Sequence, residues 1–147
     1  MTYTGYSAYN RVATTVDSKE IMLVKLLGGT VRFIQAAKSG MDAGSPKIKG
    51  ENIYKAVSIV TELDCALDRE MGGDLVDNLS DLYRYILGRL TAANLHSDKQ
   101  ILNEVEELLT TIKEGFAEAL KQDTSASDMG QMPSYQTESQ RGLNVAA

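Results

Sequence analysis

Apolar residues recur at intervals of three and four positions along four segments of this chain. Such spacing places them on one face of an α-helix, because an α-helix completes a turn in about 3.6 residues. The chain also has no tryptophan and only two phenylalanines, a composition that suits packed helices better than sheets. The sequence therefore predicts an all-α fold.

Capping residues mark the start of each predicted helix. The string Asp17-Ser18-Lys19-Glu20 is a capping box, and Ser45-Pro46 places proline at a first helical position. Asp74 is the expected cap of the third helix, and Ser97 with Gln100 forms a second capping box. These signals predict that four helices begin near residues 17, 45, 74 and 97.

Glycines are expected to end the first two helices, at Gly40 and at the pair Gly72-Gly73. The predicted helices then span residues 17–39, 45–71, 74–94 and 97–121, with similar lengths and connections of about two to five residues. Connections this short force consecutive helices to run antiparallel. The sequence thus predicts an antiparallel up-down-up-down four-helix bundle whose helices cross at about 20°.

Two segments are expected to lie outside the bundle of residues 17–121. Residues 1–16 form a tyrosine-rich lead-in, interpreted as an N-terminal strap. Residues 122–147 are rich in serine, threonine, glutamine and glycine and show no helical periodicity. This composition predicts a disordered C-terminal tail, because too few apolar residues are available to offset the entropy of ordering.

Charge and hydropathy exclude several classes of function. The formal net charge is −5, and the fifteen basic residues are scattered, which argues against nucleic-acid binding. The longest apolar run is far too short to cross a bilayer, so no membrane insertion is expected. The polar start of the chain and the single, unpaired Cys65 predict a cytoplasmic protein. Cys65 itself is expected to be a buried thiol on a helix.

The sequence offers few groups for catalysis. His96 is the sole histidine and is expected in a loop, so no histidine-paired nucleophile and no Glu-x-x-His metal motif can form. Glu104, Glu106 and Glu107 are interpreted as a solvated face of the fourth helix. We therefore expect no enzyme, no cofactor and no metal site. A helical enzyme or metal carrier built on Glu104, Glu107 and His96 remains the alternative that elemental analysis would test.

Apolar residues cover more of the first and third predicted helices than one bundle seam requires. Either the core is large, or grooves between helices stay open for an amphipathic segment of a partner. Gly28 and Gly29 lie in the middle of the first helix, where each costs about 1 kcal/mol relative to alanine. The expected compensation is close approach of another helix or of a bound peptide.

The lead-in contains three tyrosines at three-residue spacing, Tyr3, Tyr6 and Tyr9. On one side of a helical turn, their rings would present apolar surface and their hydroxyls would remain polar. Such a segment can occupy an apolar groove and leave it again. The alternative is a strap that packs permanently on the bundle.

Several short strings, in this order and spacing, resemble the FliS family of flagellar export chaperones over about residues 6–120. They are Ala8-Tyr9-Asn10, Leu26-Leu27-Gly28-Gly29 with Phe33-Ile34 and Ala36-Ala37, Lys55-Ala56 with Ile59-Val60 and Glu62-Leu63, Leu67-Asp68-Arg69-Glu70-Met71-Gly72-Gly73, Asn78-Leu79 with Leu82-Tyr83-Arg84-Tyr85, Leu90-Thr91-Ala92-Ala93-Asn94, and Glu104-Val105 with Leu108-Leu109. The sequence departs from the family pattern at three places. Lys19 replaces a usual proline, Leu27 a usual tyrosine, and Phe116 a usual tryptophan.

The resemblance implies a cytosolic chaperone that binds the disordered C-terminal segment of flagellin. Binding would prevent premature polymerisation and keep flagellin competent for flagellar type III secretion. The resemblance also allows contacts with components of the export gate. The free protein is expected to be a monomer or weak homodimer. The alternative is a self-associating structural bundle, or an adaptor, that binds no flagellin.

The resemblance places the binding groove along the third helix and its neighbours. Tyr6 and Tyr9 are assigned to a displaceable lead-in or to direct partner contact. The full set of expected partner-binding residues is Tyr6, Tyr9, Leu63, Leu67, Leu75, Leu79, Tyr83, Ile86 and Leu90.

Overall fold

The computed structural model describes the backbone of residues 15–70 and 72–146, and the side chains of residues 19–70 and 72–122. Within these ranges the chain forms four helices and no strand: α2 (Thr15–Asp42), α3 (Pro46–Cys65), α4 (Asp74–His96) and α5 (Lys99–Ala146). Residues 1–14 of the predicted lead-in of residues 1–16, with Tyr6 and Tyr9, lie outside the described residues.

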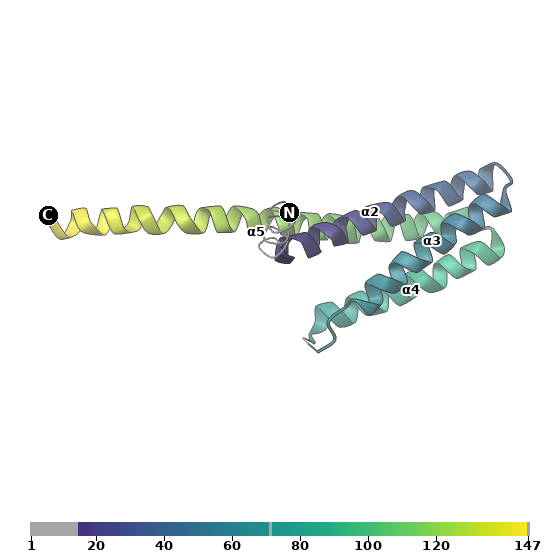
Figure 1. Ribbon diagram of the computed structural model, residues 1–147, viewed down its shortest axis with the longest axis horizontal. Coiled ribbons are helices and arrows are strands. Elements are labelled where there is room, and N and C mark those ends of the chain that lie inside the picture. The colour runs from purple at the N-terminus through teal and green to yellow at the C-terminus, as the bar shows by residue number, and fades with distance from the viewer. Residues whose placement is uncertain (1–14, 71, 147) are drawn as a thin grey trace, which may run out of the picture.

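Each helix reverses the direction of the one before it (Figure 1). Helix α2 packs against α3 and α5, and α4 packs against the same two helices. In the described part of the chain the diagonal pairs, α2 with α4 and α3 with α5, do not pack against each other. The predicted all-α, four-helix bundle is confirmed.

The core runs along the centre of the bundle and takes residues from all four helices. Fully buried side chains include Leu27 and Ile34 on α2, Val60 on α3, Ile86 and Leu90 on α4, and Leu102 and Leu109 on α5. Burying one such side chain stabilises the fold by about 1.5–3 kcal/mol. No described helix is both long and apolar enough to cross a membrane.

Short connections and ion pairs fasten one end of the bundle, the closed end. Here the end of α2 lies near the start of α5, and Lys99 forms a 2.8 Å ion pair with Asp42. Lys49 of α3 donates hydrogen bonds to the backbone oxygen of Asn94 and to the Ser97 hydroxyl, at 3.1 and 2.7 Å. These contacts hold all four helices in register at this end.

The first two helices end at other residues than the sequence predicted. Helix α2 continues through Gly40 to Asp42, and the left-handed turn falls at Gly44, with φ of 66°. Gly40 lies where α3 crosses α2 closely, since an added Cβ would lie 2.7 Å from the Lys49 nitrogen. The glycine therefore permits this close packing and does not end the helix. Helix α3 begins at Pro46 as expected but already ends at Cys65. The described residues that follow, 66–70 and 72–73, are not helical, so the connection to α4 is longer than the sequence predicted.

The caps of α4 and α5 also differ from prediction. Asp74 is the first helical residue, and Gly73 precedes it as a cap without a side-chain hydrogen bond. Ser97 ends α4 in a left-handed conformation, whereas Asp98 accepts hydrogen bonds from the amides of Gln100 and Ile101. Ser97 and Asp98, the two residues between α4 and α5, can both cap a helix. The Asp98 carboxylate takes that role at the start of α5.

Two expectations about single residues were wrong. Cys65 is exposed, because α3 ends there and the side chain falls on the outside of the bundle. His96 is exposed as expected but belongs to the last turn of α4. Neither residue takes part in a metal cluster, since the described residues hold no group of three histidine, cysteine or acidic side chains.

The predicted acidic face of α5 is in fact divided between two neighbouring helices. Glu104 accepts hydrogen bonds from Tyr85 and Arg89 of α4. Glu106 accepts hydrogen bonds from Gln35 and Lys38 of α2, the latter also an ion pair. These carboxylates therefore tie α5 to α4 and to α2.

Helix α5 is much longer than the other three. Its backbone continues beyond the predicted end at residue 121 to Ala146, and its last turns extend away from the other helices (Figure 1). The side chains of residues 123–147 lie outside the described set. The disorder predicted for residues 122–147 stays a prediction about the chain in solution.

Candidate functional site

A cavity of about 580 Å³ lies at the end of the bundle opposite the closed end. At this open end α2 and α5 diverge from α3 and α4 (Figure 1). We call it the open-end cavity. Its lining residues are Lys19, Met22, Leu23, Leu26, Leu63, Ala66, Leu67, Leu79, Tyr83 and Phe116.

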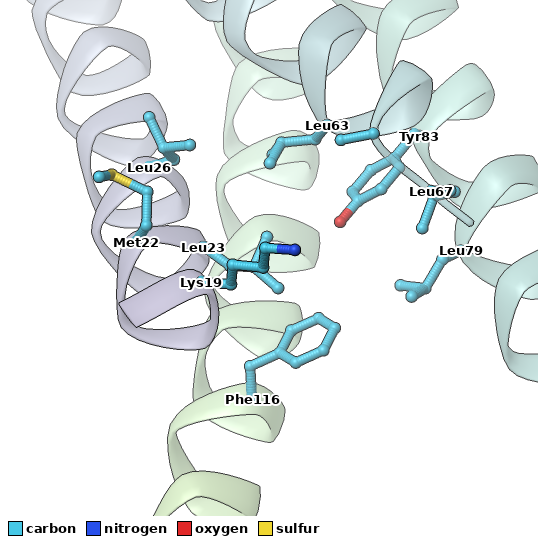
Figure 2. Close-up of a pocket in the computed structure, with 10 residues that line it drawn as sticks. Lys19, Met22, Leu23, Leu26, Leu63, Leu67, Leu79, Tyr83 and Phe116 are labelled. Carbon is cyan, nitrogen blue, oxygen red and sulfur yellow. The ribbon is translucent and has the colours of Figure 1, made fainter. Parts of the chain in front are cut away.

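One wall of the open-end cavity comes from the first turns of α2. Met22, Leu23 and Leu26 follow helical spacing, so the same periodicity that builds the core continues past the point where the other helices diverge. Met22 is 56% exposed despite its apolar side chain. Methionine is flexible and polarisable and can adapt to different occupants. Phe116 of α5 extends this apolar wall (Figure 2).

The opposite wall comes from the end of α3, the connection that follows it, and α4. Leu63 is nearly buried, while Leu67 and Leu79 are half-buried and face the hollow (Figure 2). Burying their remaining apolar surface under a partner would gain about 25 cal/mol per Å². This wall is therefore suited to an apolar occupant.

A cluster of polar side chains holds the connection of residues 66–73 beside the cavity. Arg69 donates hydrogen bonds to the Asp64 carboxylate and to the Ser80 hydroxyl, at 3.0 and 3.1 Å. Ser80 in turn donates a 2.9 Å hydrogen bond to Asp64. The cluster fixes the segment that carries Leu67, so this part of the wall is preformed.

Tyr83 of α4 is the most buried polar side chain of the lining. The residue is 1% exposed, and its hydroxyl points into the hollow, where it forms no hydrogen bond with the described residues (Figure 2). Burial, and to a smaller extent the negative charge of Asp64, raise the pKa of Tyr83 above its ordinary value. The hydroxyl is therefore neutral near pH 7 and able to donate.

The structure divides the residues that the sequence assigned to partner binding into three groups. Leu63, Leu67, Leu79 and Tyr83 line the open-end cavity. Ile86 and Leu90 are fully buried in the core, so in this conformation they cannot contact a partner. Leu75 is 68% exposed and lies outside the cavity lining. Tyr6 and Tyr9 lie outside the described residues.

Sequence reasoning missed the α2 and α5 walls of the cavity. The signal was the wide apolar arc of the first helix, which continues through Met22 and Leu23 to its first turns. Periodicity alone could not say that α4 and α2 diverge at that level. Two of the three departures from the family pattern, Lys19 and Phe116, also line the cavity, whereas Leu27 is fully buried.

The lining residues offer an apolar binding surface and no catalytic set. Among the described residues that line the cavity, only Lys19 and Tyr83 have polar side chains, and no carboxylate, imidazole or thiol joins them. Acid–base or nucleophilic catalysis needs at least a pair of such groups within hydrogen-bond reach. The geometry supports binding of an apolar segment.

Comparison with known proteins places the chain in a family. The family described as "Flagellar protein FliS" matches residues 2–123. The chain belongs to the FliS family. The resemblance found in the sequence is confirmed.

Relatives within the FliS family match along most of their length. The flagellar secretion chaperone FliS of Salmonella typhimurium is 37% identical over 78% of this chain and 89% of its own length. The flagellar secretion chaperone FliSB of Pseudomonas aeruginosa is 38% identical over 76% of this chain and 89% of its own. The FliS protein of Vibrio cholerae is 34% identical over 74% and 83% respectively. The family match over residues 2–123 includes every described residue that lines the open-end cavity.

Proposed function

We propose that this chain is a cytosolic flagellar export chaperone that binds the disordered C-terminal segment of flagellin. The complex would prevent premature polymerisation and keep flagellin competent for flagellar type III secretion. The observation that carries the proposal is the open-end cavity, an apolar hollow with a preformed wall in a member of the FliS family. No chemical step is part of the proposed function.

The cavity is the anchor site in this mechanism. Its volume falls within the range of about 300–1,000 Å³ that is typical of well-formed ligand sites, so it accepts a cluster of apolar side chains. A flagellin segment would order as it binds, and that ordering offsets part of the energy gained by burial. The surplus after this cost is the measured affinity.

Leu75 gives the bound segment a route beyond the cavity. It lies near the start of α4, on the same helix as Leu79 and Tyr83, and is largely exposed. A segment anchored in the cavity and continuing along α4 would cover it. In this proposal Ile86 and Leu90 support the wall from within the core and do not touch flagellin.

The lead-in supplies a cover for the empty cavity. Residues 1–14 directly precede α2, whose first turns form one cavity wall. An extended chain spans about 3.3–3.6 Å per residue, so Tyr6 and Tyr9 can reach the hollow. In this proposal their rings occupy it in the free protein and leave when flagellin binds. The outer faces of the helices then remain available to components of the export gate.

A second candidate is self-association, favoured by the exposed side chains of Met22, which lines the cavity, and of Ile21, its neighbour in α2. In that case two copies would bury these side chains against each other, and the bundle would serve as a structural part or adaptor without flagellin binding. Sizing chromatography over a concentration series separates the two candidates. A monomer or weak dimer that yields to a one-to-one complex supports the chaperone.

Calorimetric titration with the C-terminal segment of flagellin from the same organism tests the proposal directly. One-to-one binding with a large negative heat-capacity change is expected, because apolar surface is buried as the segment folds. Leu79→Asp should abolish this binding, since it places a charge in the cavity wall, while Leu95→Asp, on the exposed end of α4, should not. No binding by the unaltered chain at micromolar concentrations would refute the proposed function.

A further inference from the structure

The open-end cavity has an unbalanced set of polar groups. Lys19 of α2 and Tyr83 of α4 reach toward the hollow from opposite walls, and the other lining residues are apolar (Figure 2). Within the described residues, neither the Lys19 ammonium nor the Tyr83 hydroxyl has a hydrogen-bond or ion-pair partner. The Tyr83 side chain is 1% exposed, and its hydroxyl faces the hollow (Figure 2). An occupant that displaces solvent from the cavity must therefore supply a partner for this hydroxyl.

The available donors define the chemistry of that partner group. An ammonium donates only, and a neutral phenol that faces the same hollow donates most favourably to an anion. Among the described lining residues, no aspartate or glutamate competes for them. A carboxylate carried into the hollow on an apolar segment would satisfy both groups together.

The chain's own lead-in cannot provide this group. Residues 1–14 contain no aspartate and no glutamate, and their one charged side chain is Arg11. The lead-in could fill the apolar part of the cavity, but it would bring a positive charge near Lys19. A partner segment with an acidic side chain would therefore satisfy the donors that the lead-in leaves unpaired.

The geometry points to Lys19 and Tyr83 as a specificity pair that selects an apolar partner segment bearing one acidic side chain within its anchor cluster. This inference rests on the proposed function, because the segment is that of flagellin. The apolar walls supply most of the affinity for any amphipathic segment. The polar pair discriminates among segments, and in favour of the partner over the lead-in.

Single substitutions in the full-length chain separate the two contributions. Lys19→Met keeps the apolar stem and removes the charge, and should weaken flagellin-segment binding about two- to fivefold at low salt, because Lys19 is at the exposed rim. Tyr83→Phe removes only the hydroxyl and should weaken binding about tenfold, as expected for a buried hydrogen bond to a charged group. Lys25→Met is the matched control, since Lys25 is exposed on the same helix outside the cavity.

Substitutions in the flagellin segment itself provide the decisive test. Each aspartate and glutamate of the segment is replaced in turn by its amide, and each peptide is titrated against the unaltered chain and Lys19→Met. At one acidic position, the amide replacement should weaken binding to the unaltered chain but not to Lys19→Met. This difference is the coupling between the acidic position and Lys19, and about 0.5 M salt should reduce it. Circular dichroism melting of Tyr83→Phe verifies that the variant is folded.

Each outcome separates the inference from the proposed function. Coupling between Lys19 and one acidic position supports the specificity pair. Tight binding by the unaltered chain, with Lys19→Met and Tyr83→Phe equal to it and no coupled position, overturns the pair and leaves the proposed function standing. If the unaltered chain does not bind the segment at all, the proposed function fails and the inference fails with it.

Discussion

Asp64 at the end of α3 accepts a 2.9 Å hydrogen bond from the hydroxyl of Ser80 on α4. The Ser80 side chain is 4% exposed. Arg69 reaches back from the following connection to both groups. The three residues therefore fasten α3, α4 and the connection at the edge of the cavity.

Ser80→Ala is expected to lower the free energy of unfolding by about 1–3 kcal/mol, because it leaves a largely buried carboxylate without one of its donors. Urea denaturation followed by circular dichroism measures the change. Ser58→Ala is the control: Ser58 is exposed on α3 and bonds only to the backbone oxygen of Tyr54. It should shift stability by less than about 0.5 kcal/mol. Equal losses of stability in Ser80→Ala and Ser58→Ala would show that the hydrogen bonds among Asp64, Arg69 and Ser80 add no measurable stability.

Gly40→Ala should destabilise the bundle even though alanine favours helices. A Cβ at Gly40 would lie 2.7 Å from the Lys49 backbone nitrogen and 2.9 Å from Cγ2 of Ile48. The helices must move apart to admit it, at a cost of about 1–3 kcal/mol. Thermal unfolding monitored at a helical wavelength measures this loss.

Gly28→Ala provides the opposite result in the same helix. A Cβ there would meet only Cδ of Lys113, at an ordinary 3.8 Å. The substitution should stabilise the protein by up to about 1 kcal/mol through helix propensity. The close helix approach that the sequence suggested for Gly28 and Gly29 is instead found at Gly40. Destabilisation by both alanines, or by neither, would contradict this assignment.

Periodicity was enough to predict the helices and their order, because burial of one apolar face is encoded by local spacing. It could not locate the end of α3. Leu67 continues the apolar pattern past Cys65. However, Arg69 donates hydrogen bonds to Asp64 and Ser80, and these side-chain contacts, which apolar periodicity does not reveal, favour the connection over a longer helix. Similarly, either Ser97 or Asp98 could cap α5, and the choice depends on which one also ends α4.

The sequence predicted part of the candidate site, because local apolar spacing indicates which residues face other helices. Apolar spacing and family resemblance together found Leu63, Leu67, Leu79 and Tyr83. They could not distinguish cavity wall from core, so Ile86 and Leu90 were included although the core buries them. Whether a helical leucine faces a groove depends on where neighbouring helices diverge, which is a property of the whole bundle.

Lowering the pH should weaken the tie between α5 and α2. Burial tends to raise the pKa of Glu106, but the hydrogen bonds from Lys38 and Gln35 and the charge of Lys38 outweigh it and hold the pKa below the ordinary 4.5. A carboxyl group with a lowered folded-state pKa stabilises the fold above its unfolded-state pKa. That contribution is lost as the pH falls from about 4.5 through the folded-state pKa.

Glu106→Gln is therefore expected to be about 1 kcal/mol less stable than the unaltered chain near pH 7. The difference should shrink as both proteins are brought below about pH 4.5, where the unaltered carboxylate gains its proton. Urea midpoints over a pH series measure it. Glu107→Gln, exposed and one position along α5, should show no such convergence. A constant difference at all pH values would exclude the carboxylate charge as the cause.

Alanine substitutions along α4 should separate core from binding surface in one experiment. Ile86→Ala creates a hole among fully buried side chains and should cost about 2–5 kcal/mol of stability.

Leu79→Ala, at the half-buried cavity wall, should cost less stability and weaken flagellin-segment binding about tenfold or more. Leu75→Ala should leave stability unchanged, because the side chain is 68% exposed, and should weaken binding only if the segment continues along α4. Unfolding and titration are measured on the same preparations. A different result would be a folded Ile86→Ala variant that loses binding while Leu79→Ala binds normally. That result would show that the segment binds in the core of an opened bundle and not in the cavity.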